Sequence, residues 1–120
     1  MPVSLDFAAP STFILRSSGK VACEEGRHAL SEVLRDPRFG PGAALLNEAV
    51  GVTEVPSTAE LCLLASDLVP LIRKGLRRIA IVTPEKLVGV ARTFATFAGV
   101  LNANVRVFQQ LSEAQRWLAQ

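Results

Sequence analysis

Apolar residues are distributed along the chain in two alternating patterns. Some segments are short apolar runs, which are typical of β-strands, while longer segments repeat their apolar positions every three or four residues, as amphipathic helices do. The run Ile79–Val82 is apolar throughout, which indicates a strand buried on both faces of a parallel sheet. The predicted strands are Val3–Phe7 at an edge, Thr12–Ser18, Gly42–Val52 with its exit loop, Ile79–Val82 and Asn104–Phe108.

The helical pattern occupies the segments between these strands. A turn is predicted at Gly19 and Lys20, before the first helix, and Pro70 is predicted to kink the second helix because it lacks a backbone donor. Thr83 precedes a proline and an acid, a combination that favours a helix start. The predicted helices are residues 22–36, 56–75 and 86–101, followed by a short final helix from Ser112.

Strand and helix therefore alternate four times. This alternation predicts an α/β fold with a mostly parallel sheet of four to five strands, flanked by helices and joined by right-handed crossovers. The length of 120 residues suits one domain, and no repeat, low-complexity segment or long linker divides the chain. We expect a single domain over residues 1–120.

Composition excludes two classes of chain. With 49% hydrophobic residues, the chain buries enough apolar surface to offset the entropy of ordering, which excludes disorder. The longest stretch without a charge, Thr93–Val105, has 13 residues, whereas a bilayer span needs ~20. The N-terminal stretch lacks the basic residues of a signal peptide, and the 2 cysteines are too few for a disulfide framework. We expect a cytoplasmic protein with no membrane span.

The charge distribution limits the partners only loosely. The net charge of +2 is too small to argue for nucleic acid, so we expect no nucleic-acid partner. Residues 1–60 carry five basic and eight acidic groups, while residues 61–120 carry eight and three. Much of the second surplus falls at the expected end of a helix, where cations favour the negative end of the helix dipole; a basic patch for an anionic partner is the alternative. These cations are Arg73, Lys74, Arg77 and Arg78.

No arrangement of residues carries a recognisable reaction. His28, the only histidine, lies on the charged face of the first helix with no nucleophile at helical spacing, and the cysteines are too far away in sequence to suggest a zinc site. Glu24 and Glu25 are adjacent, so they lie about 100° apart on a helix and do not face each other. No glycine pattern resembles a nucleotide-binding loop. We expect no enzymatic activity, no catalytic residue, no metal and no cofactor.

Polar residues gather where the predicted strands end. In a parallel sheet, ligands bind outside the carboxyl ends of the strands, beside the helix N-termini. This geometry selects a candidate ligand edge, with the hydroxyls as candidate phosphate acceptors. Its residues are Asn47, Glu48, Ser57, Thr58, Thr83 and Gln109 with Gln110. Structural roles compete: Ser57 fits a capping box with the glutamate three residues later, Thr83 fits a helix cap, and Glu48 fits a solvated charge.

The segment 86–101 is more apolar than contact with one sheet requires. Its apolar positions span about 180° of the helix circumference, against the ~100° that a helix normally buries. Three explanations stay open: packing against a neighbouring helix, a homodimer interface, or an apolar ligand crevice beside the helix. The candidate residues for such an interface or ligand wall are Val88, Val90, Arg92, Phe94 and Phe97.

Several short motifs follow one another in a recognisable order. They are Gly19 with Glu24-Glu25, Asp36-Pro37-Arg38-Phe39, Gly89–Arg92, and Val105–Phe108 followed by Ala114 and Trp117-Leu118. In this combination the chain resembles, over roughly residues 12–119, the SpoIIAA-like, STAS-type small bacterial proteins, relatives of the sporulation anti-sigma-factor antagonists. The resemblance implies a four- or five-stranded sheet flanked by helices and no known enzymatic activity.

The resemblance also implies two kinds of function. In the antagonists a partner kinase phosphorylates a serine at the helix start after the central strand, and Ser57 or Thr58 occupies the comparable place. For some relatives an apolar or lipid ligand is suspected. We therefore expect a non-enzymatic regulatory or protein-interaction module whose partner is another protein or a second copy, as a homodimer. The alternative is a protein that binds a small apolar ligand or lipid in a crevice beside the 86–101 helix.

Overall fold

The computed structural model of the chain describes residues 3–120. Most of its elements match the predicted ones to within two residues. The strands are β1 (Val3–Ala8), β2 (Thr12–Lys20), β3 (Ala44–Glu54), β4 (Arg78–Val82) and β5 (Val105–Phe108). The helices are α1 (Cys23–Arg35), α2 (Thr58–Ser66), α3 (Leu68–Arg73), the 3₁₀ turn η1 (Glu85–Leu87), α4 (Val88–Val100) and α5 (Leu111–Leu118).

The strands form one five-stranded sheet in the order β1-β2-β3-β4-β5. A short hairpin joins β1 to β2, so this pair is antiparallel, whereas every later pair is separated by a helical crossover and is parallel. The predicted α/β fold with a mostly parallel sheet is therefore confirmed.

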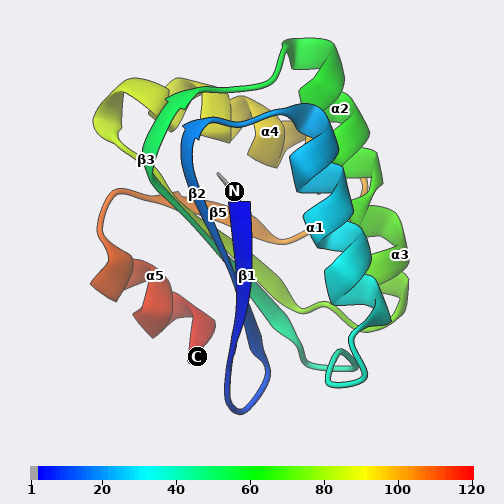
Figure 1. Cartoon of the computed structure of the whole chain (residues 1–120). Helices are drawn as coiled ribbons and strands as arrows, with labels where there is room; N and C mark the ends of the chain where they lie inside the picture. The colour runs from blue at the N-terminus through cyan, green and yellow to red at the C-terminus, as the bar shows by residue number, and fades with distance from the viewer. Residues whose placement is uncertain (1–2) are drawn as a thin grey trace.

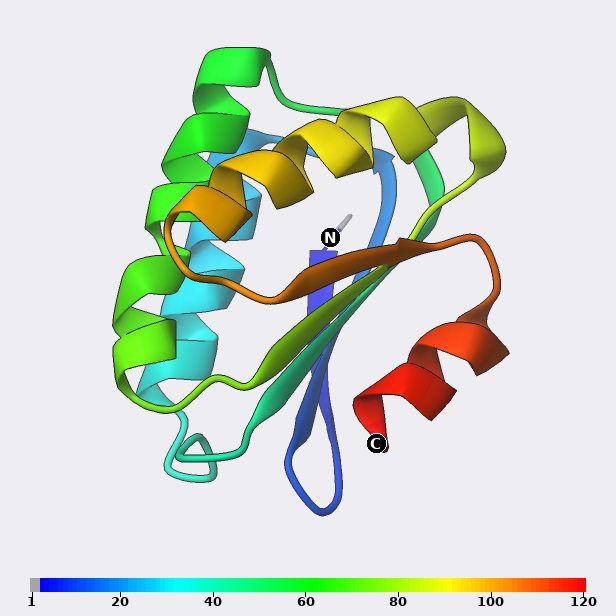
Figure 2. The ribbon, with the colours of Figure 1, turned by 180° about the vertical axis from the view of Figure 1, so that it is seen from behind.

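Helices cover the two faces of the sheet unequally (Figures 1 and 2). One face, here called the four-helix face, packs against α1, α2, α3 and α4, and the opposite α5 face packs against α5 alone. Because successive side chains of a strand point to opposite faces, Leu45 joins the core of the four-helix face and Leu46 the core of the α5 face. The continuous apolar run in β4 reflects burial on both faces.

The predicted turn at Gly19 and Lys20 is wrong, because both residues extend β2. Gly19 pairs with Val52 and Lys20 with Glu54 across shifts in register that mark β-bulges. Gly19 has a φ of 65°, a conformation that glycine adopts without steric cost. The long β3 supplies backbone partners that the local sequence of β2 does not reveal.

The expectation that Asn47 and Glu48 follow their strand is also wrong. Both lie inside β3, which continues to Glu54 because β2 offers it a partner along this length. Their neighbour β4 is shorter and ends at Val82, opposite Glu48. Asn47 and Glu48 therefore stand level with the carboxyl end of β4 while remaining within the sheet.

The predicted kinked helix over residues 56–75 is two helices. The break falls at Asp67, and Pro70 lies in the first turn of α3, where a missing backbone N–H costs no hydrogen bond. Asp67 also accepts a hydrogen bond of 2.8 Å from Nε of Arg27 on α1, which ties the break to the neighbouring helix. The chain thus breaks one turn before its proline instead of bending at it.

The predicted helix cap at Thr83 is not formed. Pro84 occupies the N-cap position of η1, and no side chain caps this turn. Thr83 is instead buried, and its backbone N–H donates to the carbonyl of Phe108 over 3.0 Å, which extends the contact between β4 and β5. Pairing with β5 therefore draws Thr83 into the sheet layer.

Candidate functional site

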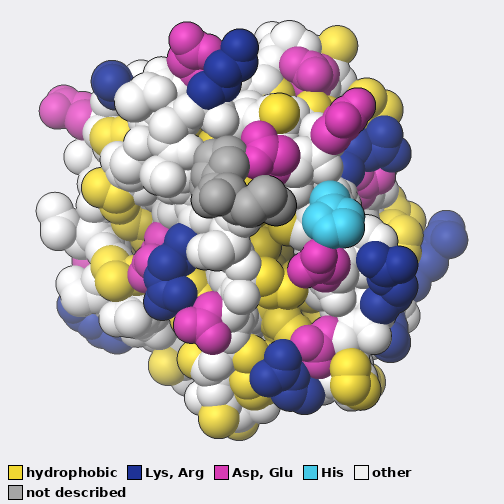
Figure 3. Space-filling view, viewed as in Figure 1, with side chains coloured by type: hydrophobic (Ala, Val, Ile, Leu, Met, Phe, Trp, Pro, Cys, Tyr) yellow, Lys and Arg dark blue, Asp and Glu magenta, His cyan; other side chains and the backbone are white. Residues whose placement is uncertain are grey.

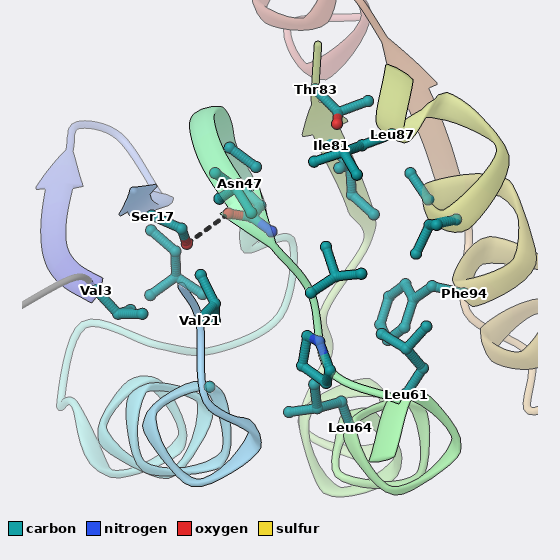
Figure 4. Close-up of a pocket in the computed structure, with 18 of the residues that line it drawn as sticks. Val3, Ser17, Val21, Asn47, Leu61, Leu64, Ile81, Thr83, Leu87 and Phe94 are labelled. Atoms are coloured by element: carbon teal, nitrogen blue, oxygen red, sulfur yellow. Dashed lines mark hydrogen bonds between the residues drawn. The ribbon is translucent and has the colours of Figure 1, made fainter. Parts of the chain in front are cut away.

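A cavity of about 160 Å³ lies between the four-helix face of the sheet and its helices (Figure 4). Most of its lining comes from β2, β3, β4 and the residues that follow these strands, and from α1, α2, α4 and the start of α3. Its lining residues are Val3, Leu15, Ser17, Val21, Gly26, Leu30, Leu45, Asn47, Ala49, Val52, Val55, Pro56, Leu61, Leu64, Leu68, Ile79, Ile81, Thr83, Leu87, Val90, Ala91 and Phe94.

The arrangement of the helices and the size of the lining side chains both leave this space. Figure 2 shows α4 lying across α2, which it contacts, instead of running alongside it. Short residues, Ala49 on β3 and Ala91 on α4, then line the gap between the helices and the sheet. No long side chain extends from these two positions to fill it. Gly26 on α1 also lines the cavity, but Leu64 of α2 packs into the place of its missing side chain.

The cavity meets solvent where its lining residues are partly exposed. Val55, in the connection between β3 and α2, is 37% exposed, whereas Leu45, Ile79 and Ile81 on the floor are buried. Apolar surface continues from the cavity between β1 and α1, where Figure 3 shows apolar side chains gathered with charged side chains beside them. The opening therefore lies at the carboxyl ends of the strands, the edge of the sheet that the sequence singles out.

Three polar side chains interrupt the apolar wall. The hydroxyl of Ser17 on β2 donates to Oδ1 of Asn47 on β3 over 3.3 Å, and Thr83 follows β4 on the same face. Among the described residues, neither the amide nitrogen of Asn47 nor the hydroxyl of Thr83 has a hydrogen-bond partner, and no such unpaired atom is fully buried. Both groups therefore remain accessible.

The lining side chains from the described part of the chain include no charged residue and no histidine. The shifted pKa values belong to other places. Burial raises the pKa of the Cys23 thiol, and hydrogen bonds from Arg38 lower the pKa of Asp36 to about 2, at the opposite end of the four-helix face. Residues 3–120 contain no group of three His, Cys, Asp or Glu side chains placed to hold a metal ion.

The structure separates the predicted site residues into five places. Asn47, Thr83, Val90 and Phe94 line the cavity together. Phe97, on the same helix, does not line it but packs, partly buried, against the core.

Val88 and Arg92 face a separate cleft on the outer side of α4. Its other lining residues are Val107, Phe108, Gln109, Gln110 and Glu113, from β5 and the start of α5. The wide apolar arc predicted for this helix therefore divides between the cavity, the core and this second cleft.

Ser57 and Thr58 are exposed at the start of α2. The predicted capping box is confirmed: Oγ of Ser57 accepts from the backbone N–H of Glu60 over 3.3 Å, and the backbone N–H of Ser57 donates to Oε1 of Glu60 over 3.0 Å. The preceding residue, Pro56, lines the cavity, so this helix start lies beside the cavity opening.

Glu48 lies on the α5 face, one residue after Asn47 and on the opposite side of β3. Its Oε2 accepts from Nε of Arg16 over 2.9 Å, and Arg16 also donates to Asp6 over 3.2 Å. The structure therefore places Glu48 in a row of surface charges across three strands, apart from the cavity.

Several lining residues were not predicted as site residues. Ser17 follows Phe13 and Leu15 at the two-residue spacing of one strand face, so this pattern could have placed it on the apolar side. Leu61 and Leu64 have no such signal, because their helical pattern does not show whether they fill a core or border a space.

The five-stranded sheet, the helices on both of its faces and their order along the chain define an α/β domain of the STAS type. The SpoIIAA-like family model matches residues 14–119, and the chain belongs to the SpoIIAA-like family. The resemblance seen in the sequence is thereby confirmed. Among curated proteins, none matches the chain. No helix in residues 3–120 is long and apolar enough to cross a membrane.

A solved structure shows the same fold. It is an uncharacterised protein of the DUF3478 family with a SpoIIAA-like fold, from Shewanella loihica PV-4. The alignment has a TM-score of 0.65 and 15% sequence identity, and it covers 97% of this chain and 91% of the other. At this identity the likeness concerns the fold.

Proposed function

We propose that this chain is a non-enzymatic binding domain that holds a small apolar molecule in the cavity beneath α4. The observation that carries the proposal is the cavity itself: about 160 Å³ of space with mostly apolar lining, in the core of a chain of 120 residues. Protein interiors normally contain few voids larger than a water molecule. An apolar pocket that opens to solvent and carries a few polar groups is the kind of site in which small molecules bind.

The size of the cavity limits the guest. An engineered apolar cavity of about 150 Å³ binds benzene or xenon, so the space beneath α4 suits a molecule of one ring or a short branched chain. The half-exposed lining residues at the opening, Val55 among them, leave room for a longer apolar tail to extend toward solvent. A lipid would fit with only part of its chain inside.

Titration with α-methylstyrene, followed by NMR of backbone amides, tests this proposal. We expect saturable shifts at Val90 and Phe94. Replacing Ala91 by Leu puts a longer side chain into the cavity, so it should weaken binding at least tenfold. The matched control is Ala95→Leu, one turn along α4 and outside the lining, which should bind like the wild type. Equal binding by Ala91→Leu and the wild type, or no saturable shifts at all, would contradict the proposal.

A regulatory or protein-interaction role is the second candidate, and exposed groups beside the cavity opening favour it. Ser57 and Thr58 present hydroxyls at the start of α2, close in sequence to the exposed side chains of Val50 and Val55. The N-terminus of a helix stabilises an added phosphate, and a phosphate adds ~1.5 to 2 negative charges. Phosphorylation here would change the surface that a partner protein or a second copy contacts.

Substitutions at the two hydroxyls separate this role from simple capping. Ser57→Asp keeps a capping side chain, so it and Thr58→Glu should leave the melting temperature nearly unchanged while abolishing capture of the partner from a lysate of the host. Thr96→Glu, on the exposed side of α4, is the matched control. If Thr58→Glu and Thr96→Glu capture the same proteins, and sedimentation shows monomers throughout, the interaction role fails.

A further inference from the structure

Polar groups in the cavity come from three adjacent strands. Ser17 on β2, Asn47 on β3 and Thr83 after β4 all face the helices. Asn47 is level with Leu15 and Ile81, and Ser17 and Thr83 lie two residues further toward the carboxyl ends of their own strands. Toward the amino ends of β3 and β4 only apolar side chains line the cavity, such as Leu45 and Ile79. The cavity therefore has a polar end and an apolar end.

The orientation of Asn47 gives the polar end its hydrogen-bonding character. Because Oδ1 accepts from the hydroxyl of Ser17, the amide nitrogen is left as a donor, and Figure 4 shows it turned away from Ser17. The hydroxyl of Thr83 adds a second group that can donate. A molecule that enters without an acceptor would leave these donors desolvated and unpaired, which costs ~1–3 kcal/mol for each group.

The lack of charged side chains in the lining restricts which hydrogen-bond acceptor the cavity can hold. No lysine, arginine or histidine is among the described lining residues, so a buried carboxylate or phosphate would find no opposite charge. Burying an unpaired charge is far more costly than burying a neutral polar group that is hydrogen-bonded. The acceptor that fits is neutral.

We infer that the cavity selects a neutral apolar molecule with one hydrogen-bond acceptor, such as a ketone or ester carbonyl, held by the amide of Asn47 with Thr83 beside it. This inference rests on the proposed function and specifies its ligand. The apolar body of the molecule lies among Leu61, Leu64 and Phe94, which Figure 4 shows at the other end of the cavity from Thr83.

Two probes of nearly equal shape test the inference. Acetophenone carries a carbonyl oxygen where α-methylstyrene carries a methylene group, and benzoate adds a negative charge. Dissociation constants come from amide NMR titrations of the wild type and of Asn47→Leu, which removes the donor while keeping a side chain of similar size. The ratio of the two constants for each protein cancels general effects of the variant on the cavity.

Asn47→Leu should weaken acetophenone about five- to tenfold relative to α-methylstyrene, the equivalent of one hydrogen bond. Thr83→Val, which keeps the shape of threonine, should produce a smaller change in the same direction. It replaces Asn47→Leu in the test if that variant does not fold. Glu48→Gln, on the opposite face of β3, is the control and should change neither constant. Benzoate should not bind at pH 7.

The outcomes distinguish this inference from the function it rests on. If α-methylstyrene binds but neither Asn47→Leu nor Thr83→Val changes the ratio, or if benzoate binds as well as acetophenone, the cavity is a binding site without the selectivity inferred here. If neither neutral probe binds the wild type, the binding function and the inference both fail.

Discussion

The two faces of the sheet are packed in opposite ways. The α5 face is a small core closed by one eight-residue helix, and its cluster consists of Ala44, Leu46, Ala80, Val82, Ala114, Trp117 and Leu118. The four-helix face has a larger core, yet it leaves a cavity of about 160 Å³ where α4 lies across α2. The better covered face is thus the one that holds the apolar cavity.

Aromatic and cationic side chains close the α5 face. The ring of Trp117 packs 5.8 Å from that of Phe108, and the guanidinium groups of Arg78 and Arg106 lie over it at 5.0 and 5.4 Å. Arg77 donates to the carbonyl of Leu118 and Arg78 to that of Trp117, at the C-terminal end of α5. Arg77 and Arg78 therefore bind carbonyl groups at the C-terminal end of α5, and not those at the end of α3, the helix that precedes them in the sequence.

The difference separates packing from open space between the two faces. Because the cavity is open to solvent on one side, its lining side chains forgo part of the packing contacts that a filled core would give them. The α5 face buries its cluster under α5 on one side of the strands, while the four-helix face leaves the space that the proposed function assigns to a guest on the other.

The largest expected effect is the loss of packing on the α5 face. Trp117→Ala should lower the free energy of unfolding by about 3–5 kcal/mol, because the ring is almost fully buried and the sheet behind it is rigid. Urea unfolding of the variant and the wild type measures the difference. A loss below about 1 kcal/mol would show that this face is not the filled core described here.

Two substitutions that enlarge an alanine side chain should change the free energy of unfolding in opposite directions on the two faces. Ala80→Leu adds volume to the filled α5 face and should destabilise by about 1–3 kcal/mol. Ala91→Leu extends into the cavity of the four-helix face and should stabilise by about 1 kcal/mol. Thermal and urea unfolding of both variants provide the comparison. Equal destabilisation would mean that the space beneath α4 is already filled.

The smallest effect concerns the closed end of the four-helix face, far from the cavity opening. Hydrogen bonds from the Arg38 guanidinium and backbone N–H to Asp36 lower the carboxyl pKa from 3.8 to about 2. A lowered pKa gives stability that is complete above about pH 4 and disappears as the pH falls toward 2. The wild type should therefore be slightly more stable than Asp36→Asn at pH 6, with the difference shrinking below pH 4.

Urea unfolding at a series of pH values checks this last prediction. Arg38 also stacks on the ring of Phe7 in β1, 4.1 Å from its centroid. Asp36→Asn therefore tests whether the pairing of Asp36 with Arg38 helps to close the four-helix face at this end. A stability difference that stays constant between pH 6 and pH 2.5 would show that the Asp36 carboxylate does not contribute through this pairing. Binding of α-methylstyrene should be unchanged at pH 6 in either case.

Local periodicity predicted the elements whose structure depends on their own residues. The alternation in β2 and the helical spacing in α1 specify these elements within one or two residues, and the capping box at Ser57 is readable from Ser57 and Glu60 alone. The incorrect predictions concern residues whose structure depends on a strand far away in the sequence. Gly19 stays in its strand because β3 is long, and Thr83 is buried because β5 pairs with its backbone.

The cavity could be predicted only in outline. An excess of apolar surface on residues 86–101 suggested space or a partner beside this helix, and Val90 and Phe94 do line the cavity. Whether apolar side chains fill a core or border a space depends on how α4 packs across α2, and no local pattern encodes that packing. Asn47 shares the cavity with Thr83 because both lie on the four-helix face, with Asn47 paired to Ile81, two residues before Thr83.

A crystal structure of the protein under xenon pressure tests the contrast between the two faces most directly, because xenon occupies apolar cavities without needing a hydrogen bond. We predict xenon density beneath α4, between Leu45, Leu61 and Phe94, and none on the α5 face around Leu46 and Trp117. Side chains closed over the space beneath α4, with xenon absent there or bound on the α5 face instead, would contradict the account.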